Sequence, residues 1–172
     1  MSQVFFRKEL VKIKQDKRLV VVSHCVLNQN VVVKGWQRAA GAFPFVRYLL
    51  EEGVSLLQLP CPELLELGRD RPPLEYSDYA KIPNYRSKCQ QLIEPTLDQI
   101  RCYQNSGAKY LGVIGINDSP NCSISGQRGV LMEEFFTASE KNHFSTAYIE
   151  VPVWYSTENQ GDFLAAVKEF IR

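Results

Sequence analysis

The sequence has no long hydrophobic run and no excess of charge of either sign. No stretch approaches the roughly eighteen apolar residues of a membrane span, and the N-terminus, with Arg7 and Lys8 after two phenylalanines, lacks a segment of signal-peptide length. The formal net charge is only +1, so there is no bulk attraction for nucleic acid or an anionic membrane. We therefore expect a cytoplasmic protein that binds neither nucleic acid nor a membrane.

Nucleotide-binding and compact metal-binding motifs are also missing. The chain has no GxGxxG or P-loop pattern, and none of its five cysteines belongs to a CxxC pair. With 172 residues it is long enough for one domain with a substantial core, and too short for two domains of ordinary size. We expect a single domain over residues 1–172, in which residues 1–18 form a basic N-terminal arm.

Alternating apolar runs and helical patterns predict an α/β fold. Strands are expected at 19–23, 54–59, 146–153 and from Leu111 onward. Helices are expected at 39–52, 85–105 and 130–141, followed by a C-terminal helix that a capping box at Thr157 and Gln160 opens. Pro44 should bend the first helix, and Pro95 should kink or break the second. This alternation is typical of a three-layer domain with a mostly parallel sheet and helices on both faces, as in Rossmann and flavodoxin-like folds. The irregular segment 64–83 is an excursion that would cover a site.

Three cysteines occupy equivalent positions, each in a polar loop directly after a predicted strand. They are Cys25, Cys61 and Cys122. Neighbouring strands lie about 5 Å apart, so the ends of three adjacent parallel strands bring their side chains within roughly 10 Å of one another. Open α/β sheets bind their ligands in the crevice beyond these carboxyl ends. We expect the three cysteines to converge, so that one metal centre can collect all three thiolates.

The residues alone leave several chemistries open. Three thiolates without an obvious fourth ligand suit a zinc ion completed by a histidine, or an iron-sulfur cluster with one open iron. Of the two histidines, His143 should lie at the opposite end of the sheet, and an extended backbone would turn His24 away from Cys25. A Cys-His hydrolase explains only one cysteine, and a non-catalytic metal-binding or cluster-binding module is a further alternative. Cys89 and Cys102 fit ordinary helix positions, and Cys89 lies on the apolar face.

Three short motifs follow one another along the chain: Ser23-His24-Cys25, Cys61-Pro62-Glu63 and Asp118-Ser119-Pro120-Asn121-Cys122. In this order, over about residues 20–126, the chain resembles the 2-thiouracil desulfurase family. The resemblance implies a 4Fe-4S cluster on Cys25, Cys61 and Cys122, with its fourth iron open to the sulfur of a thiolated base. It also implies Glu63 and Ser119 as catalytic side chains. A cluster held by only three cysteines should be labile in air.

The surroundings of these motifs depart from the family pattern. A polar Arg-Tyr-Asp trio in the family is Val32-Val33-Lys34 here, and Ser123 replaces a glycine after the last cysteine. We therefore expect a related desulfidase that acts on a different small thiolated compound of thionucleobase type. Polar and aromatic residues of the neighbouring loops are its candidate substrate contacts: Asn28, Asn30, Lys34, Trp36, Arg69 and Arg71.

Overall fold

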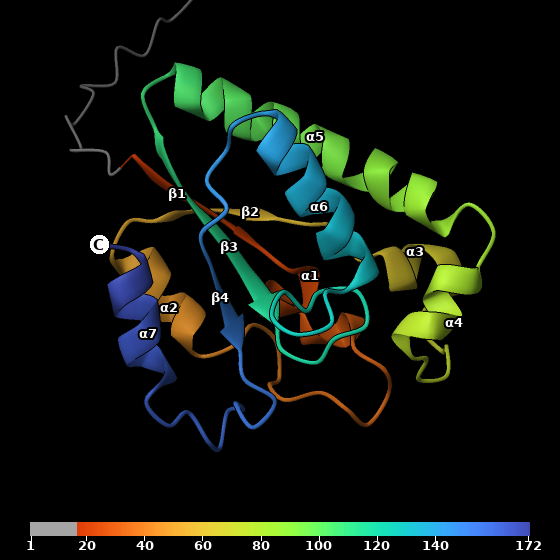
Figure 1. The fold of residues 1–172 in the computed structure, drawn as a ribbon. Helices are drawn as coiled ribbons and strands as arrows, with labels where there is room; N and C mark the ends of the chain where they lie inside the picture. Colours follow the sequence, from red (N-terminus) through yellow and green to blue (C-terminus); the bar gives the residue numbers. More distant parts are fainter. Residues whose placement is uncertain (1–16) are drawn as a thin grey trace, which may run out of the picture.

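The computed structural model describes residues 17–172, and Figure 1 shows its arrangement around one sheet. Almost all of the predicted N-terminal arm lies outside the described residues. Four strands form the sheet in the order β2-β1-β3-β4, and every neighbouring pair is parallel. Their bounds are Arg18–Val22 for β1, Ser55–Gln58 for β2, Lys109–Ile116 for β3 and Tyr148–Val151 for β4. The predicted α/β fold with a parallel sheet is confirmed.

Helices cover both faces of this sheet, so the fold has three layers (Figure 1). The helices α5 (Tyr85–Asn105) and α6 (Val130–Lys141) pack on one face, and α2 (Phe45–Glu51) and α7 (Phe163–Phe170) pack on the other. Alternation along β1 supplies both cores, because Leu19 and Val21 face the first layer while Val20 and Val22 face the second. No helix within residues 17–172 is long and apolar enough to cross a bilayer.

Short helices line the carboxyl edge of the sheet. The first strand runs into α1 (His24–Leu27) and a 3-10 helix, η1 (Gln29–Val31). The predicted excursion 64–83 is more regular than expected, since it contains the end of α3 (Pro62–Leu67) and all of α4 (Tyr76–Lys81). These elements connect the strand ends to the outer helices and enclose the site described below.

Two prolines behave differently from the sequence prediction. The helix predicted at 39–52 begins only at Phe45, because Pro44 takes its N-cap position instead of bending it. A proline is tolerated at a helix start, where its missing N–H has no intrahelical partner to lose. Pro95 lies inside α5 without ending it, so the predicted break is wrong. Its position is exposed, where water can serve the carbonyl that the missing N–H leaves unpaired.

The capping box predicted at Thr157 and Gln160 is also wrong. The helix α7 begins six residues after Thr157, at Phe163, and its N-cap is Asp162. Thr157 instead donates its backbone N–H to the carbonyl of Arg38, at 2.9 Å. The local sequence predicts a helix start at Thr157, but its backbone N–H is used in a tertiary hydrogen bond to Arg38. The apolar stripe of α7 is correct, since Phe163 and Val167 are buried in the second core.

Candidate three-cysteine site

The three predicted cysteines converge on one cavity at the carboxyl edge of the sheet. Strand β1 pairs with β2 on one side and β3 on the other, so the loops carrying Cys25, Cys61 and Cys122 leave three adjacent strands. All three cysteines line a cavity of about 480 Å³, together with Glu63 and Ser119. The adjacency expected from the strand pattern is therefore confirmed.

Backbone hydrogen bonds hold the first two cysteines in place. Cys25 lies in α1, and its carbonyl accepts a hydrogen bond from the buried side chain of Gln29 at 2.7 Å. Cys61 is the N-cap of α3, and its carbonyl accepts the first helical bond from Leu65 at 3.2 Å. Just before it, the N–H of Leu59 donates to Val22 at the end of β1. Both thiols are thus attached to the ends of regular elements.

The Cys122 loop folds back on the strand that precedes it. The carbonyl of Cys122 accepts the N–H of Ile116 at 2.9 Å, and its N–H donates to the hydroxyl of Ser119 at 3.0 Å. A side chain at Gly115 would bring its Cβ to 2.7 Å from the Cys122 carbonyl. Glycine in this buried strand is therefore required by the close approach of the loop. Ser119 also has the turn-forming role that its position in the loop suggests.

The carboxylate of Glu150, on β4, holds the residues that follow Cys122. It accepts the N–H of Ile124 at 2.6 Å and that of Ser125 at 3.1 Å. The hydroxyls of Ser123 and Ser125 also donate to it. Glu150 is not among the cavity-lining residues. It therefore shapes the third cysteine loop from the outer side, and the sequence offered no sign of this role.

Burial opposes ionisation of the three thiols. It raises the pKa of Cys25 to about 12 and that of Cys61 to about 11, and it raises the pKa of Cys122 well above the ordinary value. The negative charge of neighbouring thiolates adds to the effect: that of Cys61 acts on Cys25, and those of both act on Cys122. The three thiols are therefore close enough to oppose one another's ionisation, and a bound cation would relieve this repulsion.

A buried hydroxyl lies beside these thiols. The Oγ of Ser23 is fully enclosed and has no hydrogen-bond partner of ordinary geometry among the described residues. Its proximity lowers the pKa of Cys122 slightly, against the larger effect of burial. A buried donor of this kind favours an acceptor next to Cys122.

Glu63 lines the same cavity and is fixed by two partners. It lies in the first turn of α3, where the helix dipole favours a carboxylate. Arg71 donates from Nε to its Oε2 at 2.9 Å and forms an ion pair with it, Nη2 lying 2.8 Å from Oε2, and Asn121 donates from Nδ2 to Oε1 at 3.1 Å. Tyr85 in turn donates its hydroxyl to the Asn121 amide oxygen at 3.1 Å. Arg71 and Asn121 thus fix the orientation of the Glu63 carboxylate at the border of the cavity.

The six predicted substrate contacts separate into two groups. Trp36 and Arg71 line the cavity, and the side chain of Arg71, only 3% exposed, is occupied by Glu63. The other four are not among the lining residues: Asn28, Asn30, Lys34 and Arg69. Asn28 caps η1 by accepting the N–H of Asn30 at 3.0 Å. Residues close to the motifs in the sequence therefore do not necessarily line the cavity.

The remaining cysteines and histidines are placed as follows. Cys89 is buried in the first core, as predicted, and Cys102 is exposed on α5. The backbone at His24 is helical, not extended, and His24 lines the cavity with its Nδ1 at 3.2 Å from the Leu59 carbonyl. His143 is exposed in the loop before β4. Within residues 17–172, no group of three or more His, Cys, Asp or Glu side chains is arranged to hold a metal ion.

Arg38 is the main cavity residue that sequence reasoning missed. Its Nη1 donates to the carbonyls of Pro152 at 2.5 Å and Val153 at 3.1 Å, beyond the end of β4. Its positive charge lowers the pKa of Cys25, against the larger effect of burial. An isolated arginine in a loop has no local signal for such a role, because its partners are more than a hundred residues away.

One relative is similar over nearly the whole of both chains. It is the protein named "Uncharacterized protein MJ0003" from Methanocaldococcus jannaschii, 41% identical over 155 residues that cover 90% of this chain and 95% of the relative. No family model matches the chain, and no solved structure matches it. Identity of this extent shows common descent.

Proposed function

The chain belongs to the same family as MJ0003 of Methanocaldococcus jannaschii, and we propose that it is an iron-sulfur-dependent desulfidase that removes sulfur from a small thiolated compound. The observation that carries the proposal is the convergence of Cys25, Cys61 and Cys122 on one cavity that Glu63 also borders. In the net reaction a water oxygen bonds to the thiocarbonyl carbon, and the carbon-sulfur bond breaks. The two protons of the water leave with the sulfur as hydrogen sulfide, so no oxidant or reductant is consumed.

The chemistry of the donors supports a cluster on three thiolates, although the three side chains are not arranged as a metal site among the described residues, so that binding has to draw them together. Thiolates are the ligands that iron-sulfur clusters prefer, and three adjacent strand ends present them to one space. Binding of a cluster would remove the proton from each thiol. The positive charge of the iron would offset the repulsion between thiolates, which adds to the effect of burial on their pKa values. When bound, a 4Fe-4S cluster on three cysteines supplies one iron that can accept the sulfur of a thiocarbonyl group as a soft Lewis acid.

The residues around the cysteines supply the proton transfers. Arg71 and Asn121 orient the carboxylate of Glu63, and Oε1 keeps acceptor capacity beyond its bond to Asn121. Glu63 can thus take a proton from the attacking water and pass it to the departing sulfur. Ser119 accepts from Cys122 through an oxygen lone pair, so its own hydroxyl hydrogen stays available as a donor at the cavity wall.

Anaerobic reconstitution tests the proposal directly. We expect about four iron and four acid-labile sulfide per chain, and release of hydrogen sulfide from a thiocarbonyl compound such as 2-thiouracil. Cys122→Ser should abolish iron binding, whereas Cys102→Ser, at an exposed cysteine outside the cavity, should retain it. If Cys122→Ser retains iron, the proposed ligand set of three cysteines is wrong. If the protein binds zinc and no iron, the cavity is a zinc site and the desulfidase proposal is wrong. If a stable cluster forms and no sulfide is released, the protein is a cluster-binding module and not an enzyme of this kind.

A further inference from the structure

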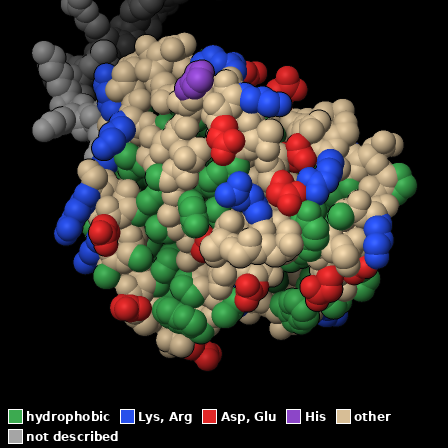
Figure 2. Space-filling model, in the orientation of Figure 1, with side chains coloured by type: hydrophobic (Ala, Val, Ile, Leu, Met, Phe, Trp, Pro, Cys, Tyr) green, Lys and Arg blue, Asp and Glu red, His purple; other side chains and the backbone are tan. Residues whose placement is uncertain are grey.

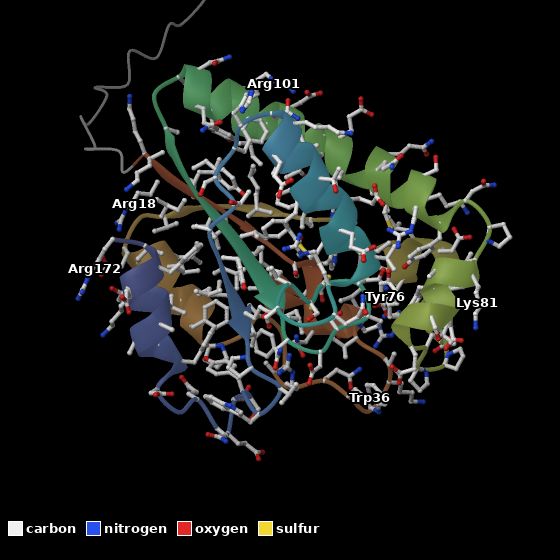
Figure 3. The ribbon with its side chains drawn as sticks, in the orientation of Figure 1. Arg18, Trp36, Tyr76, Lys81, Arg101 and Arg172 are labelled. Carbon is white, nitrogen blue, oxygen red and sulfur yellow. The ribbon has the colours of Figure 1, made fainter. Side chains whose placement is uncertain are left out.

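The cavity wall away from the cysteines is largely apolar. It is built from segments that are far apart in the sequence and meet only in the fold: Val32, Val33, Trp36, Pro73, Leu74 and Val153. Trp36 lies on the loop below the carboxyl ends of the strands (Figure 3), and its side chain is 62% exposed. Val153, in the segment after β4, is 52% exposed. Exposed apolar residues that converge on the rim of a cavity indicate a surface that a ligand covers.

The space-filling view agrees with this placement. In Figure 2 hydrophobic side chains reach the surface toward the lower edge, where the strands β3 and β4 end in Figure 1. Charged side chains are more frequent in the upper right part of this face.

One of the two arginines of the cavity is paired with a carboxylate, and the other donates to backbone carbonyls. Among its described lining residues, only Arg38 and Arg71 carry a permanent positive charge. Arg71 pairs with Glu63 and donates to the carbonyls of Gly68 at 3.1 Å and Val31 at 2.9 Å. Arg38 directs its Nη1 to backbone carbonyls beyond β4. The lining also contains the exposed carboxylate of Asp118, which disfavours a second anion.

We propose that the substrate of this site is a neutral thiocarbonyl compound that carries an apolar substituent. Phosphorylated and carboxylated thio compounds are disfavoured, because the wall offers them hydrophobic contacts, the Asp118 carboxylate repels them and the charge of Arg71 is paired with Glu63. This inference rests on the proposed desulfidase function and specifies its substrate class. Trp36 is the specificity-determining residue, since it presents the largest exposed apolar surface at the rim.

Three analogues with one reacting group test the substrate class. They are 2-thiouracil, 6-propyl-2-thiouracil and 6-carboxy-2-thiouracil, which differ only in the substituent at one ring position. We expect kcat/KM for sulfide release to be about tenfold higher for the propyl compound than for 2-thiouracil, because a few methylene groups in an apolar pocket supply this much discrimination. The carboxylated compound should be at least about tenfold poorer than 2-thiouracil. Equal or better turnover of the carboxylated compound would overturn the inference and leave the desulfidase function standing.

A pair of tryptophan variants locates the preference. Trp36→Ala should abolish most of the advantage of the propyl compound. Trp154→Ala should preserve it, because Trp154 is exposed to a similar degree and does not line the cavity. An unchanged preference in Trp36→Ala would contradict the role of Trp36.

Binding separates failure of this inference from failure of the proposed function. The affinity of the full chain for the propyl and carboxylated compounds can be measured calorimetrically, before and after reconstitution. One outcome is that none of the three compounds releases sulfide, while the propyl compound binds at least about tenfold more tightly than the carboxylated compound. The desulfidase function is then wrong, and the preference of the pocket for an apolar substituent is supported. If the carboxylated compound binds as tightly, the inference falls whatever the turnover.

Discussion

Two carboxylates stand at the same edge of the sheet and are held in different ways. Glu63 borders the cavity and is paired with the guanidinium of Arg71. Glu150 lies outside the cavity lining and accepts hydrogen bonds from two backbone amides and two hydroxyls of the Cys122 loop. The first carboxylate is balanced by a formal charge, and the second is balanced by neutral dipoles.

This difference indicates which carboxylate is available for chemistry. Glu150 is committed to the shape of a loop, since its oxygens accept from residues 123–125. Glu63 keeps one side toward the space in which the three thiols meet. We therefore propose that Glu63 is the carboxylate that transfers protons, whereas Glu150 positions the loop. The following predictions test that division of roles, from the largest expected effect to the smallest.

Replacement of the cavity carboxylate should affect turnover most. Glu63→Gln should lower the rate of sulfide release about 100-fold or more while iron content is retained, because positioned acid-base catalysis contributes at least this factor. Glu150→Gln should stay within about tenfold of the natural protein, since the amide oxygen still accepts from one side of the loop and only the bonds to the second oxygen are lost. Full activity in Glu63→Gln would reverse the assignment. The measurements are initial rates of sulfide release and iron per chain.

Removal of the guanidinium should destabilise the fold. Arg71→Met leaves the partly buried Glu63 carboxylate without its ion-pair partner, which should lower the free energy of unfolding by about 3 kcal/mol. Urea denaturation measures this loss. Arg69→Met, at an exposed position two residues earlier, is the matched control and should change stability by less than about 0.5 kcal/mol. Adding Glu63→Gln to Arg71→Met should restore part of the loss; no restoration would argue against a charge effect.

Loss of the outer carboxylate should loosen one loop. Glu150→Ala removes the acceptor of the Ile124 and Ser125 amides and should cost about 1–2 kcal/mol. Amide hydrogen exchange should accelerate at these two residues more than at the buried core of β3. Glu158→Ala, at an exposed position, is the control. Unchanged exchange at Ile124 would show that the loop does not depend on Glu150.

The two carboxylates should also differ in their effect on thiol reactivity. Burial raises the pKa of Cys61 to about 11, and the charge of Glu63 is the next largest cause. Below this pKa the thiol form dominates, so a lower pKa increases the thiolate fraction. In cluster-free protein at pH 9, Glu63→Gln should therefore speed alkylation of Cys61 by iodoacetamide severalfold. Glu150→Gln should not, and exposed Cys102 provides an internal reference.

Sequence patterns predicted the elements whose residues are decided locally. The bounds of α5 and α6 agree with the predicted ranges 85–105 and 130–141, because long periodic stretches with clear ends carry a strong signal. The capping box at Thr157 failed because Arg38, distant in the sequence, takes that backbone N–H. Local rules describe a segment well until a tertiary partner competes for its hydrogen bonds.

The site follows the same division. The sequence by itself determined that three apolar strands each end in a cysteine, and parallel strand geometry then brings Cys25, Cys61 and Cys122 to one edge. Only the tertiary structure decided what surrounds them. It turned Arg71 from a predicted substrate contact into the partner of Glu63, and it brought Glu150 of β4 to the Cys122 loop. Local periodicity identifies strands and helices, whereas strand order, ion pairs and loop contacts join residues whose separation leaves no periodic trace.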